Sequence, residues 1–304
     1  MRILITGPGG FLGSALAKHW AASGHELWLI ARPTSSLDRL SILPASVRLE
    51  RVATFDEIVA VLRESKPDAI VHTANSYGRN GEALLDVLDA NVRFGMVLMQ
   101  TVLFDREFGS KCRPTIFLNT GTVLPSNLSP YALSKAQFSA WGALLSQQMP
   151  AKLQFINIRL QHMYGPRDDD SKFTSHVINT CFENRPYLAL TEGHQRRDLI
   201  YIDDVVSAYD LILNKSSKFR PSDEIEVGTG IAVEVRTYVE EVKRLCQSST
   251  KLGFGSLPYR MNEPMECKAN IERLKSLGWR QKVEMAAGIA ASIEMIKSTG
   301  IRSK

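Results

Sequence analysis

A tyrosine and a lysine four residues apart are the side chains of this sequence best suited to acid–base chemistry. Tyr131 and Lys135 belong to the stretch Ser-Pro-Tyr-Ala-Leu-Ser-Lys, in which a serine cap and a proline mark the start of a helix. Residues four apart on a helix share one face. A free phenol has a pKa of about 10, and a nearby ammonium lowers it by favouring the phenolate. The pair could therefore pass a proton to or from a carbinol oxygen, unless it is only a packed tyrosine beside a surface lysine.

Three glycines near the start of the chain have the spacing of a phosphate-binding turn. Gly7, Gly10 and Gly13 follow an apolar run over residues 2–6 and precede a helical pattern. Such glycines permit a tight turn and let a pyrophosphate approach bare backbone, while the helix N-terminus offers N–H groups and a positive dipole end. A purely structural glycine turn is the alternative. We predict a dinucleotide site made by Gly7, Gly9, Gly10, Phe11, Leu12 and Gly13.

The end of the second predicted strand bears on which dinucleotide binds. An acidic residue there would hydrogen-bond a ribose 2′-hydroxyl, but the sequence has Arg32, with Ser35 and Ser36 just beyond. A guanidinium suits a 2′-phosphate and replaces a carboxylate poorly. This favours NADP(H), with NAD(H) possible if Arg32 only stacks on adenine or points to solvent.

Short apolar runs alternate with helical patterns in the first half of the chain. We expect strands over residues 2–6, 26–31, 47–52, 69–74, 115–119 and 153–160, and helices over 14–23, 55–65, 81–107 and 130–148. This alternation predicts an α/β fold with a Rossmann-type doubly wound parallel sheet. We assign residues 1–160 to an NADP-binding domain, to which 195–215 would return. Residues 161–304 would mostly form a smaller C-terminal α/β substrate domain over the carboxyl edge of the sheet.

The composition of the chain argues against several classes of protein. The 304 residues are 44% hydrophobic and 23% charged, as in globular domains, and the net charge of +5 is too small and dispersed to indicate nucleic acid. No stretch approaches the roughly 20 apolar residues that span a bilayer, and the N-terminus lacks the form of a secretion signal. The six histidines and four scattered cysteines show no metal-ligand spacing. We therefore expect a cytoplasmic protein without a membrane, nucleic-acid or metal partner.

Taken together, these motifs resemble the extended short-chain dehydrogenase/reductase family, the NAD-dependent epimerase/dehydratase group that acts on sugar nucleotides. The resemblance covers nearly the whole chain. It rests on the glycine turn, His72-Thr73-Ala74, Asn91, Tyr131 with Lys135, Arg159, Tyr164-Gly165-Pro166 and the segment from Arg197 to Val205. The closest likeness is to ketoreductases that make CDP-3,6-dideoxyhexoses, such as abequose or paratose, for O-antigen.

The resemblance implies roles for further residues. Thr73, Ala74 and Asn91 would line the cofactor site together with Tyr131 and Lys135. Arg197 would reach the diphosphate of a nucleotide sugar and Arg260 could also contact it, while Gln161 and His162 would lie at the sugar. The family often forms homodimers through the helix of Tyr131 and the long helix before it, and Trp141 could lie at such a contact.

A threonine at the end of the fifth predicted strand completes the resemblance. Thr120 aligns with the family's catalytic Ser or Thr, and its hydroxyl would bond the reacting oxygen, with Thr122 as the alternative and a substrate contact. Thr120 lies only 11 residues before Tyr131, a shorter spacing than is usual in the family. The family's dehydratases carry an Asp-Glu pair where this chain has Gly121 and Thr122, so dehydration lacks its acid and base.

With dehydration excluded, the chemistry that these residues can still perform is hydride and proton transfer at a carbinol or ketone. We expect an NADPH-dependent reductase of a nucleoside-diphosphate 4-keto-6-deoxy sugar. A sugar-nucleotide 4-epimerase could use the same residues, with a tightly held cofactor that oxidises C4 and reduces it from the other face. A non-catalytic NADP-sensing module is the remaining alternative.

Overall fold

The chain divides into two compact units. The structure is a computed structural model that describes residues 1–40, 44, 46–79, 81–108 and 111–299. The first unit is Met1–Leu160 with Tyr209–Ile225, and the second is Gln161–Ala208 with Glu226–Lys304. The returning segment therefore begins at Tyr209, and the prediction that it begins at residue 195 needs correction. Strand β9 (Arg196–Tyr201) pairs with β7, β11 and β13, and these pairings keep it in the second unit.

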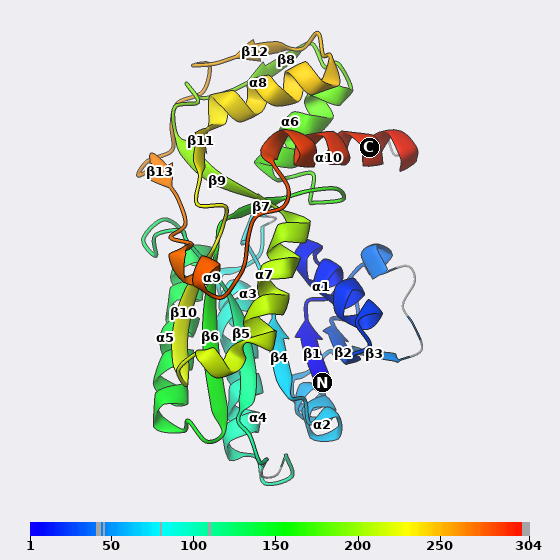
Figure 1. Cartoon of the computed structure of the whole chain (residues 1–304), viewed down its shortest axis with the longest axis vertical. Helices are drawn as coiled ribbons and strands as arrows, with labels where there is room; N and C mark the ends of the chain where they lie inside the picture. The colour runs from blue at the N-terminus through cyan, green and yellow to red at the C-terminus, as the bar shows by residue number, and fades with distance from the viewer. Residues whose placement is uncertain (41–43, 45, 80, 109–110, 300–304) are drawn as a thin grey trace. The chain divides into compact units, whose positions relative to one another are not determined.

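The described residues of the first unit build a seven-stranded parallel sheet, which confirms the predicted Rossmann-type fold (Figure 1). The strand order is β10-β6-β5-β4-β1-β2-β3. The order reverses between β1 and β4, where open α/β sheets bind their ligands beyond the carboxyl ends of the strands. The strands are β1 (Arg2–Thr6), β2 (Glu26–Ala31), β3 (Val47–Arg51), β4 (Ala69–His72), β5 (Thr115–Thr122), β6 (Leu153–Leu160) and β10 (Ser222–Val227).

Helices cover both faces of this sheet. On one face, α2 (Phe55–Ser65), α4 (Phe94–Phe104) and α5 (Pro130–Gln148) bury an apolar core with the strands. On the other lies α1 (Phe11–Ala22), and the end of α7 (Ile202–Asn214) lies beside it, because Trp20 Nε1 donates to Asp210 Oδ1 at 2.9 Å. Helix α2 begins at a capping box, which satisfies N–H groups that a helix start leaves free. The short 3₁₀ turns are Asp38–Leu40 and Ser216–Lys218.

The helix predicted over residues 81–107 is interrupted. Helix α3 (Leu84–Leu88) passes through a π-helical turn (Asp89–Arg93) into α4. The stretch Leu84–Phe104 is long and apolar enough to cross a membrane by length and composition alone, so the statement that no stretch approaches this length needs correction. Leu98, Met99 and Leu103 are fully buried in the core of the first unit, which accounts for much of the apolar character of this stretch.

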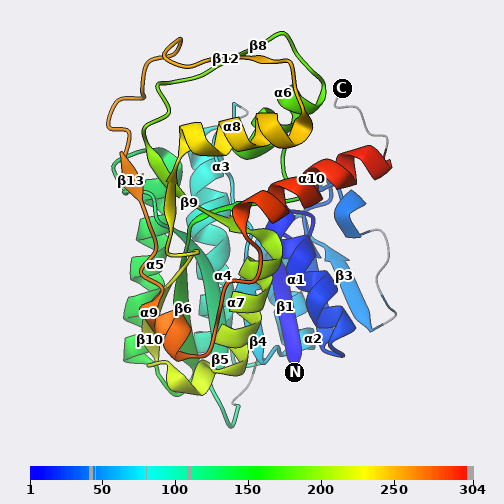
Figure 2. The same ribbon diagram turned by 45° about the horizontal axis from the view of Figure 1, so that its top comes forward.

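The second unit is built around strand β9. Strands β7 (His162–Tyr164), β11 (Ala232–Glu234) and β13 (Glu266–Cys267) pair with it, and β8 (Tyr187–Ala189) pairs with β12 (Lys251–Gly253). Helices α6 (Phe173–Phe182), α8 (Val235–Cys246) and α10 (Met285–Thr299) pack on one another, as Figure 2 shows, and α9 (Glu272–Ser276) is a single short turn.

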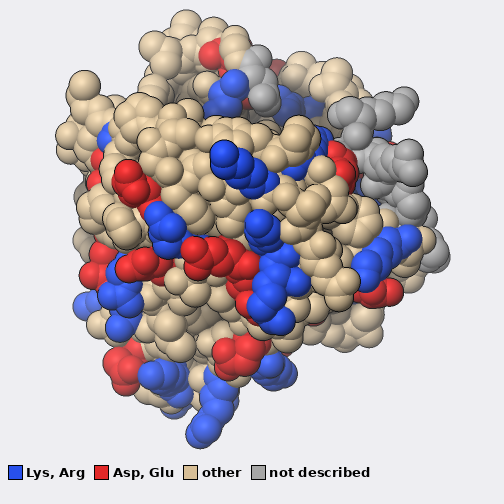
Figure 3. Space-filling model, turned by 90° about the horizontal axis from the view of Figure 1, so that it is seen from above, with Lys and Arg blue, Asp and Glu red and all other residues tan. Residues whose placement is uncertain are grey.

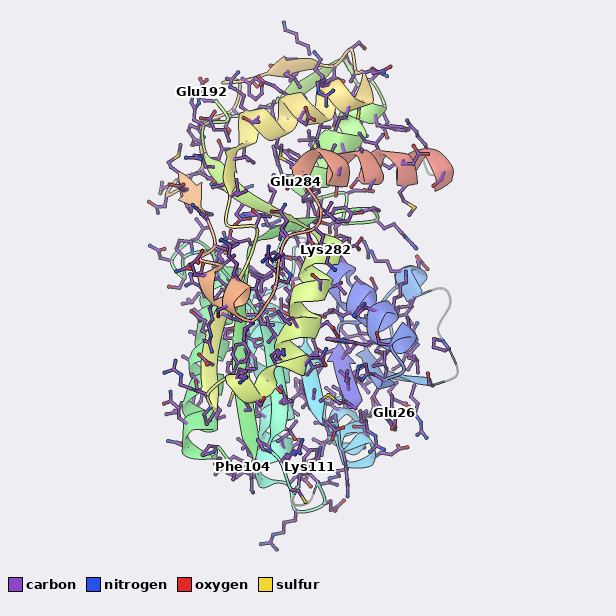
Figure 4. All side chains as sticks on the ribbon, in the orientation of Figure 1. Glu26, Phe104, Lys111, Glu192, Lys282 and Glu284 are labelled. Carbon is purple, nitrogen blue, oxygen red and sulfur yellow. The ribbon has the colours of Figure 1, made fainter. Side chains whose placement is uncertain are left out.

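Two buried carboxylates of the Arg197–Val205 segment hold the second unit's loops. Asp198 accepts hydrogen bonds from the backbone N–H groups of Thr229, Gly230 and Ala269 at 2.8–3.1 Å. Asp204 accepts from the N–H of Lys282, which Figure 4 labels on the segment leading to α10, at 2.9 Å. A carboxylate with several N–H donors can be buried without a large penalty. These bonds explain why the segment needs its aspartates.

Charges of both signs alternate over the face shown in Figure 3, and no single basic patch covers it. On α8, for example, Arg236 pairs with Glu240 and Arg244 with Glu241. The four cysteines, all among the described residues, are unpaired.

Gly142→Ala tests the packing of α5 on the sheet. A Cβ at Gly142 would lie 2.2 Å from the Phe155 ring, which is buried at 1% exposure. Alanine normally stabilises a helix interior by about 1 kcal/mol, but overpacking here should lower the free energy of unfolding by about 1–3 kcal/mol in urea denaturation. Gln147→Ala, at an exposed position of α5, should change it by less than about 0.5 kcal/mol. A Gly142→Ala protein more stable than wild type would contradict this packing.

Candidate active site

The turn after β1 has the shape that a pyrophosphate needs. Gly7 has a φ of +66°, and its carbonyl accepts from the N–H of Gly10 at 3.0 Å. A Cβ at Gly13 would lie 2.3 Å from that carbonyl, so only glycine lets α1 start this close to β1. Gly10 caps α1 with no side-chain bond. The first N–H groups of the helix, at Phe11, Leu12 and Gly13, therefore face the turn, as the sequence predicts for these residues together with Gly9.

The loop after β2 lies against this turn. A Cβ at Gly9 would lie 2.2 Å from the Ser36 carbonyl, and Arg39 Nη1 donates to the Gly9 carbonyl at 3.2 Å. Arg32 and Ser36 are exposed and Ser35 is partly buried. The loop carrying the residues predicted to read the 2′-position thus adjoins the phosphate turn.

Arg51, on the edge strand β3, holds this loop in place and was missed by reasoning from the sequence. Its Nη1 lies 3.2 Å from the Arg32 carbonyl, 2.6 Å from that of Pro33 and 3.3 Å from that of Ser35. No sequence motif identifies such a residue, because its side chain bonds only backbone carbonyls, which any residue type provides, in a loop that is distant in the sequence.

Thr73 and Ala74 support the glycine turn from β4. Thr73 Oγ1 donates to the Thr6 carbonyl at 2.7 Å, and the N–H of Ala74 donates to Thr6 Oγ1 at 3.3 Å. A Cβ at Gly7 would lie 2.8 Å from Ala74 Cα. Ala74 is partly exposed and borders the predicted cofactor site, while Thr73 is 7% exposed and mainly fixes the turn.

The predicted cofactor contact of Asn91 needs correction. Asn91 is fully buried in the π-helical turn, its Oδ1 accepts from the Ser76 N–H at 2.7 Å, and its Nδ2 donates to the Ser76 carbonyl at 2.8 Å and to Ser134 Oγ at 2.9 Å. The side chain therefore ties the loop after β4 to α5. It positions this part of the site and has no exposed surface with which to touch a cofactor.

Lys135 is a buried ammonium that lacks a protein partner. It is 1% exposed, and no described residue hydrogen-bonds its Nζ. Burial lowers the pKa of Lys135 to about 8. His72 lies near enough for the ammonium to help lower its pKa, which burial brings to about 3, so His72 stays neutral. Proteins seldom leave a buried donor unsatisfied, and a bound hydroxyl-bearing molecule would supply the missing acceptor.

Tyr131 sits one helical turn before Lys135 and is partly buried. Its ring packs on that of Tyr77 with centroids 4.7 Å apart, and the guanidinium of Arg79 lies 5.1 Å from the Tyr77 ring. The sequence predicts that Lys135 lowers the phenol pKa, and this direction needs correction. Burial is the largest cause and raises the pKa of Tyr131, so the phenol keeps its proton at neutral pH. Tyr77 and Arg79 occupy an irregular loop, where no spacing signal could reveal them.

The two candidate threonines differ in their partners. Strand β5 continues to Thr122, beyond the predicted end at residue 119, so Thr120 and Thr122 lie on the same face of the sheet. Thr122 lies near enough to the Tyr131 hydroxyl to help lower its pKa, while Tyr209 on α7 donates a hydrogen bond to Thr120 at 2.9 Å. The structure thus gives each threonine a different neighbour.

The second unit contains four of the five predicted substrate residues, whereas Thr122 belongs to the first unit. Gln161 and Arg197 are buried and His162 is partly buried. Gln161 Oε1 and His162 Nδ1 are buried and have no hydrogen-bond partner among the described residues. Burial lowers the pKa of His162 to about 4, and the charge of Arg197 adds to this effect. Arg197 is 8% exposed and pairs with Glu263, which reasoning from the sequence missed. Arg260 is exposed, and its carbonyl accepts from the Glu263 N–H.

The residues of the first unit fit a bound nicotinamide dinucleotide. The glycine turn has no room for side chains at the approach of a pyrophosphate, and the buried Lys135 Nζ has no acceptor within the described part of the chain. Within the described ranges, no group of three or more His, Cys, Asp or Glu side chains could hold a metal ion.

Comparison with known proteins gives one consistent family. The family model described as the NAD dependent epimerase/dehydratase family matches residues 3–228. The chain is 30% identical over 301 residues to CDP-abequose synthase of Salmonella muenchen, with 97% of each chain covered.

Solved structures show the same fold. UDP-glucose 4-epimerase of Thermotoga maritima, solved with UDP-glucose, superimposes with a TM-score of 0.84 at 18% identity, over 99% of this chain and 100% of that one. UDP-glucose 4-epimerase of Thermus thermophilus, solved with NAD, gives a TM-score of 0.81 at 23% identity, over 98% and 99%.

Lys135→Met should stabilise the protein while it removes activity. In the unfolded chain Lys135 keeps its proton up to a pH near 10.5, but in the folded chain only up to about 8. Between these values the unfolded state binds more protons, so the burial penalty is complete below pH 8 and fades as pH rises to 10.5. Removing the ammonium should therefore raise the free energy of unfolding by about 1–3 kcal/mol at pH 7 and by little near pH 10.

The matched control is Lys152→Met, whose ammonium donates to the Leu103 carbonyl and which should not gain stability at pH 7. Chemical denaturation from pH 7 to 10 measures both variants. A Lys135→Met protein less stable than wild type at pH 7 would show that the ammonium has a partner after all.

Proposed function

Because the chain belongs to the NAD-dependent epimerase/dehydratase family, enzymes of the extended short-chain dehydrogenase/reductase group, we propose that it reduces a nucleoside-diphosphate 4-keto-6-deoxy sugar with NADPH. The relative CDP-abequose synthase, similar over the whole length, supports a sugar-nucleotide substrate and ketoreduction in deoxysugar or O-antigen biosynthesis. We propose a cytoplasmic enzyme, since its reductant is the cell's exchangeable NADPH.

One observation supports the choice of reduction: the chain is 30% identical, over 97% of its length, to CDP-abequose synthase. Reduction of a ketone begins with a proton donor, whereas oxidation of a carbinol, the first half of epimerisation, begins with a base. Burial raises the pKa of Tyr131, which favours the protonated phenol, the form that donates. The sequence also places Gly121 and Thr122 where an acid–base pair would be needed for dehydration.

The residues of the first unit then have defined tasks. When bound, NADPH supplies the hydride for the keto carbon. Tyr131 gives its proton to the oxygen that becomes the hydroxyl group. Thr120 donates a hydrogen bond to the same oxygen and stabilises the charge that develops on it. Lys135 bonds the nicotinamide ribose, and its charge favours the phenolate that Tyr131 leaves behind.

The second unit is proposed to recognise the nucleotide sugar. Arg197 suits a diphosphate, because its planar fork bonds two oxygens at once, and Arg260 would add a second cation. Glu263 holds Arg197 in its buried position. The unpartnered Gln161 Oε1 and His162 Nδ1 would accept hydrogen bonds from sugar hydroxyls.

We also propose a homodimer through α3 and α5. Large apolar side chains of these helices are more than 40% exposed, which is unusual for a monomer surface: Leu84, Leu85, Leu88, Leu133, Trp141 and Leu144.

Purified protein should oxidise NADPH in equal amount to the keto sugar consumed. CDP-, dTDP-, GDP- and UDP-linked 4-keto-6-deoxy sugars form the panel, and absorbance at 340 nm follows the reaction. Tyr131→Phe should lower kcat at least about 100-fold, because the proton donor is lost. Turnover of a sugar nucleotide between two epimers with no net NADPH loss would instead establish the epimerase. A Tyr131→Phe protein with full biological effect would support a sensing module.

Arg32→Asp tests the cofactor assignment. If Arg32 binds the 2′-phosphate, kcat/KM for NADPH should fall about 10- to 100-fold, as for loss of a charged hydrogen bond, and the value for NADH should rise. Arg48→Asp is the control, with the same charge change on β3 at an exposed arginine that pairs with Glu64. An unchanged NADPH/NADH ratio in Arg32→Asp would contradict the preference for NADPH.

A further inference from the structure

Tyr209 is a buried tyrosine on α7 whose hydroxyl reaches the end of β5. It is 0% exposed, and with Ile212 and Leu213 it lies on the buried side of the helix. A phenylalanine would fill this space equally well, while a buried tyrosine hydroxyl needs a hydrogen-bond partner. Among the described residues that partner is Thr120, with 2.9 Å between Tyr209 Oη and Thr120 Oγ1.

The direction of this bond decides what Thr120 can do. A hydroxyl has one proton to donate and lone pairs that accept. Tyr209 donates to Thr120 Oγ1, so the threonine keeps its own proton for another acceptor. If Thr120 gave its proton to Tyr209, it could offer a substrate oxygen only lone pairs. Burial also raises the pKa of Tyr209, which keeps this hydroxyl a donor.

Thr122 has an analogous arrangement with a different target. The N–H of Leu124 donates to Thr122 Oγ1 at 3.2 Å, and Thr122 lies near enough to the Tyr131 hydroxyl to help lower its pKa. Thr120 and Thr122 therefore each accept a hydrogen bond from another residue. Thr122 is the threonine beside the Tyr131 hydroxyl, whereas Thr120, still 8% exposed, has a proton that no described contact uses.

We infer that Tyr209 is a positioning residue: its hydroxyl holds Thr120 so that the threonine donates its proton to the carbonyl oxygen of the substrate. This inference rests on the proposed function, because it assigns Thr120 and Thr122 separate tasks in the same reduction. Thr120 binds the reacting oxygen, and Thr122 orients the Tyr131 hydroxyl. Tyr209 itself touches neither substrate nor cofactor and acts only through Thr120.

Tyr209→Phe removes the hydroxyl and keeps the ring. We expect kcat to fall about tenfold. This loss is smaller than the roughly 100-fold loss that follows removal of an oxyanion donor, because Thr120 is still present and is only less well oriented. The KM for the sugar nucleotide and the Kd for NADPH should change by less than about twofold, because neither binding step uses Tyr209. Tyr238→Phe is the matched control: Tyr238 is equally buried and donates to the Thr174 carbonyl, and its loss should leave kcat unchanged.

A double-mutant cycle shows whether Tyr209 acts through Thr120. In a Thr120→Val background, Tyr209→Phe should lower kcat no further, since the Thr120 hydroxyl that Tyr209 positions is gone. In a Thr122→Val background, Tyr209→Phe should still lower kcat about tenfold, because Thr122 has its own hydrogen-bond donor and does not depend on Tyr209. An unchanged kcat in Tyr209→Phe, or independent losses in the Thr120→Val background, would overturn the inference.

The cycle is also measured on thermal unfolding, which does not depend on turnover. Positions 120 and 209 should be coupled in stability, and positions 122 and 209 should not. Kinetics are followed both as NADPH oxidation and as epimerisation, whichever the wild-type protein supports. A wild-type protein inactive on every sugar nucleotide contradicts the proposed function alone, while an absent coupling in unfolding removes the hydrogen bond on which this inference depends.

Discussion

The arrangement of the active site depends on one buried charge. Lys135 carries its ammonium on the inner face of α5 at 1% exposure, with no described protein group to bond it. Such a group opposes folding, and the surrounding core must offset its cost. Gly95 and Gly142 allow α4, α5 and β6 to pack closely around Phe138 and Phe155. Close packing fixes the helix that presents Lys135 and Tyr131. The buried ammonium lowers the stability of the fold, and the same group prepares the proposed binding and proton-transfer site.

Hydrogen bonds connect α5 to the loops around it and fix the positions of those loops. Asn91 joins the loop after β4 to α5, and this loop brings Tyr77 against the ring of Tyr131. Thr73 fixes the glycine turn at the carboxyl ends of β1 and β4. Burial there raises the pKa of the phenol, which favours its protonated form. A protonated phenol is the form that can donate to a ketone oxygen, so the packing of α5 bears on the proposed chemistry.

Local patterns made the sheet and the central residues predictable. Strands β1, β2 and β6 begin and end where the sequence predicts them, because both faces of the sheet are covered and most residues of each strand are buried. The glycine turn and the Tyr131–Lys135 pair were found because their chemistry depends on short spacing. Tyr209, Arg51 and Glu263 escaped notice, since each acts through a contact with residues at least 16 positions away. The pKa of Tyr131 was predicted in the wrong direction for the same reason: burial is a property of the tertiary structure.

The pKa of Lys135 in the ligand-free protein tests the central claim most directly. NMR titration of protein labelled with ¹³C at the lysine ε-carbon would follow each ammonium, and the spectrum of Lys135→Met would assign the resonance. We expect a midpoint at a pH near 8, and a higher one once NADPH supplies acceptors for the ammonium. A midpoint near the ordinary value of 10.5 in the free protein would show that the ammonium is solvated or paired, and would contradict the account.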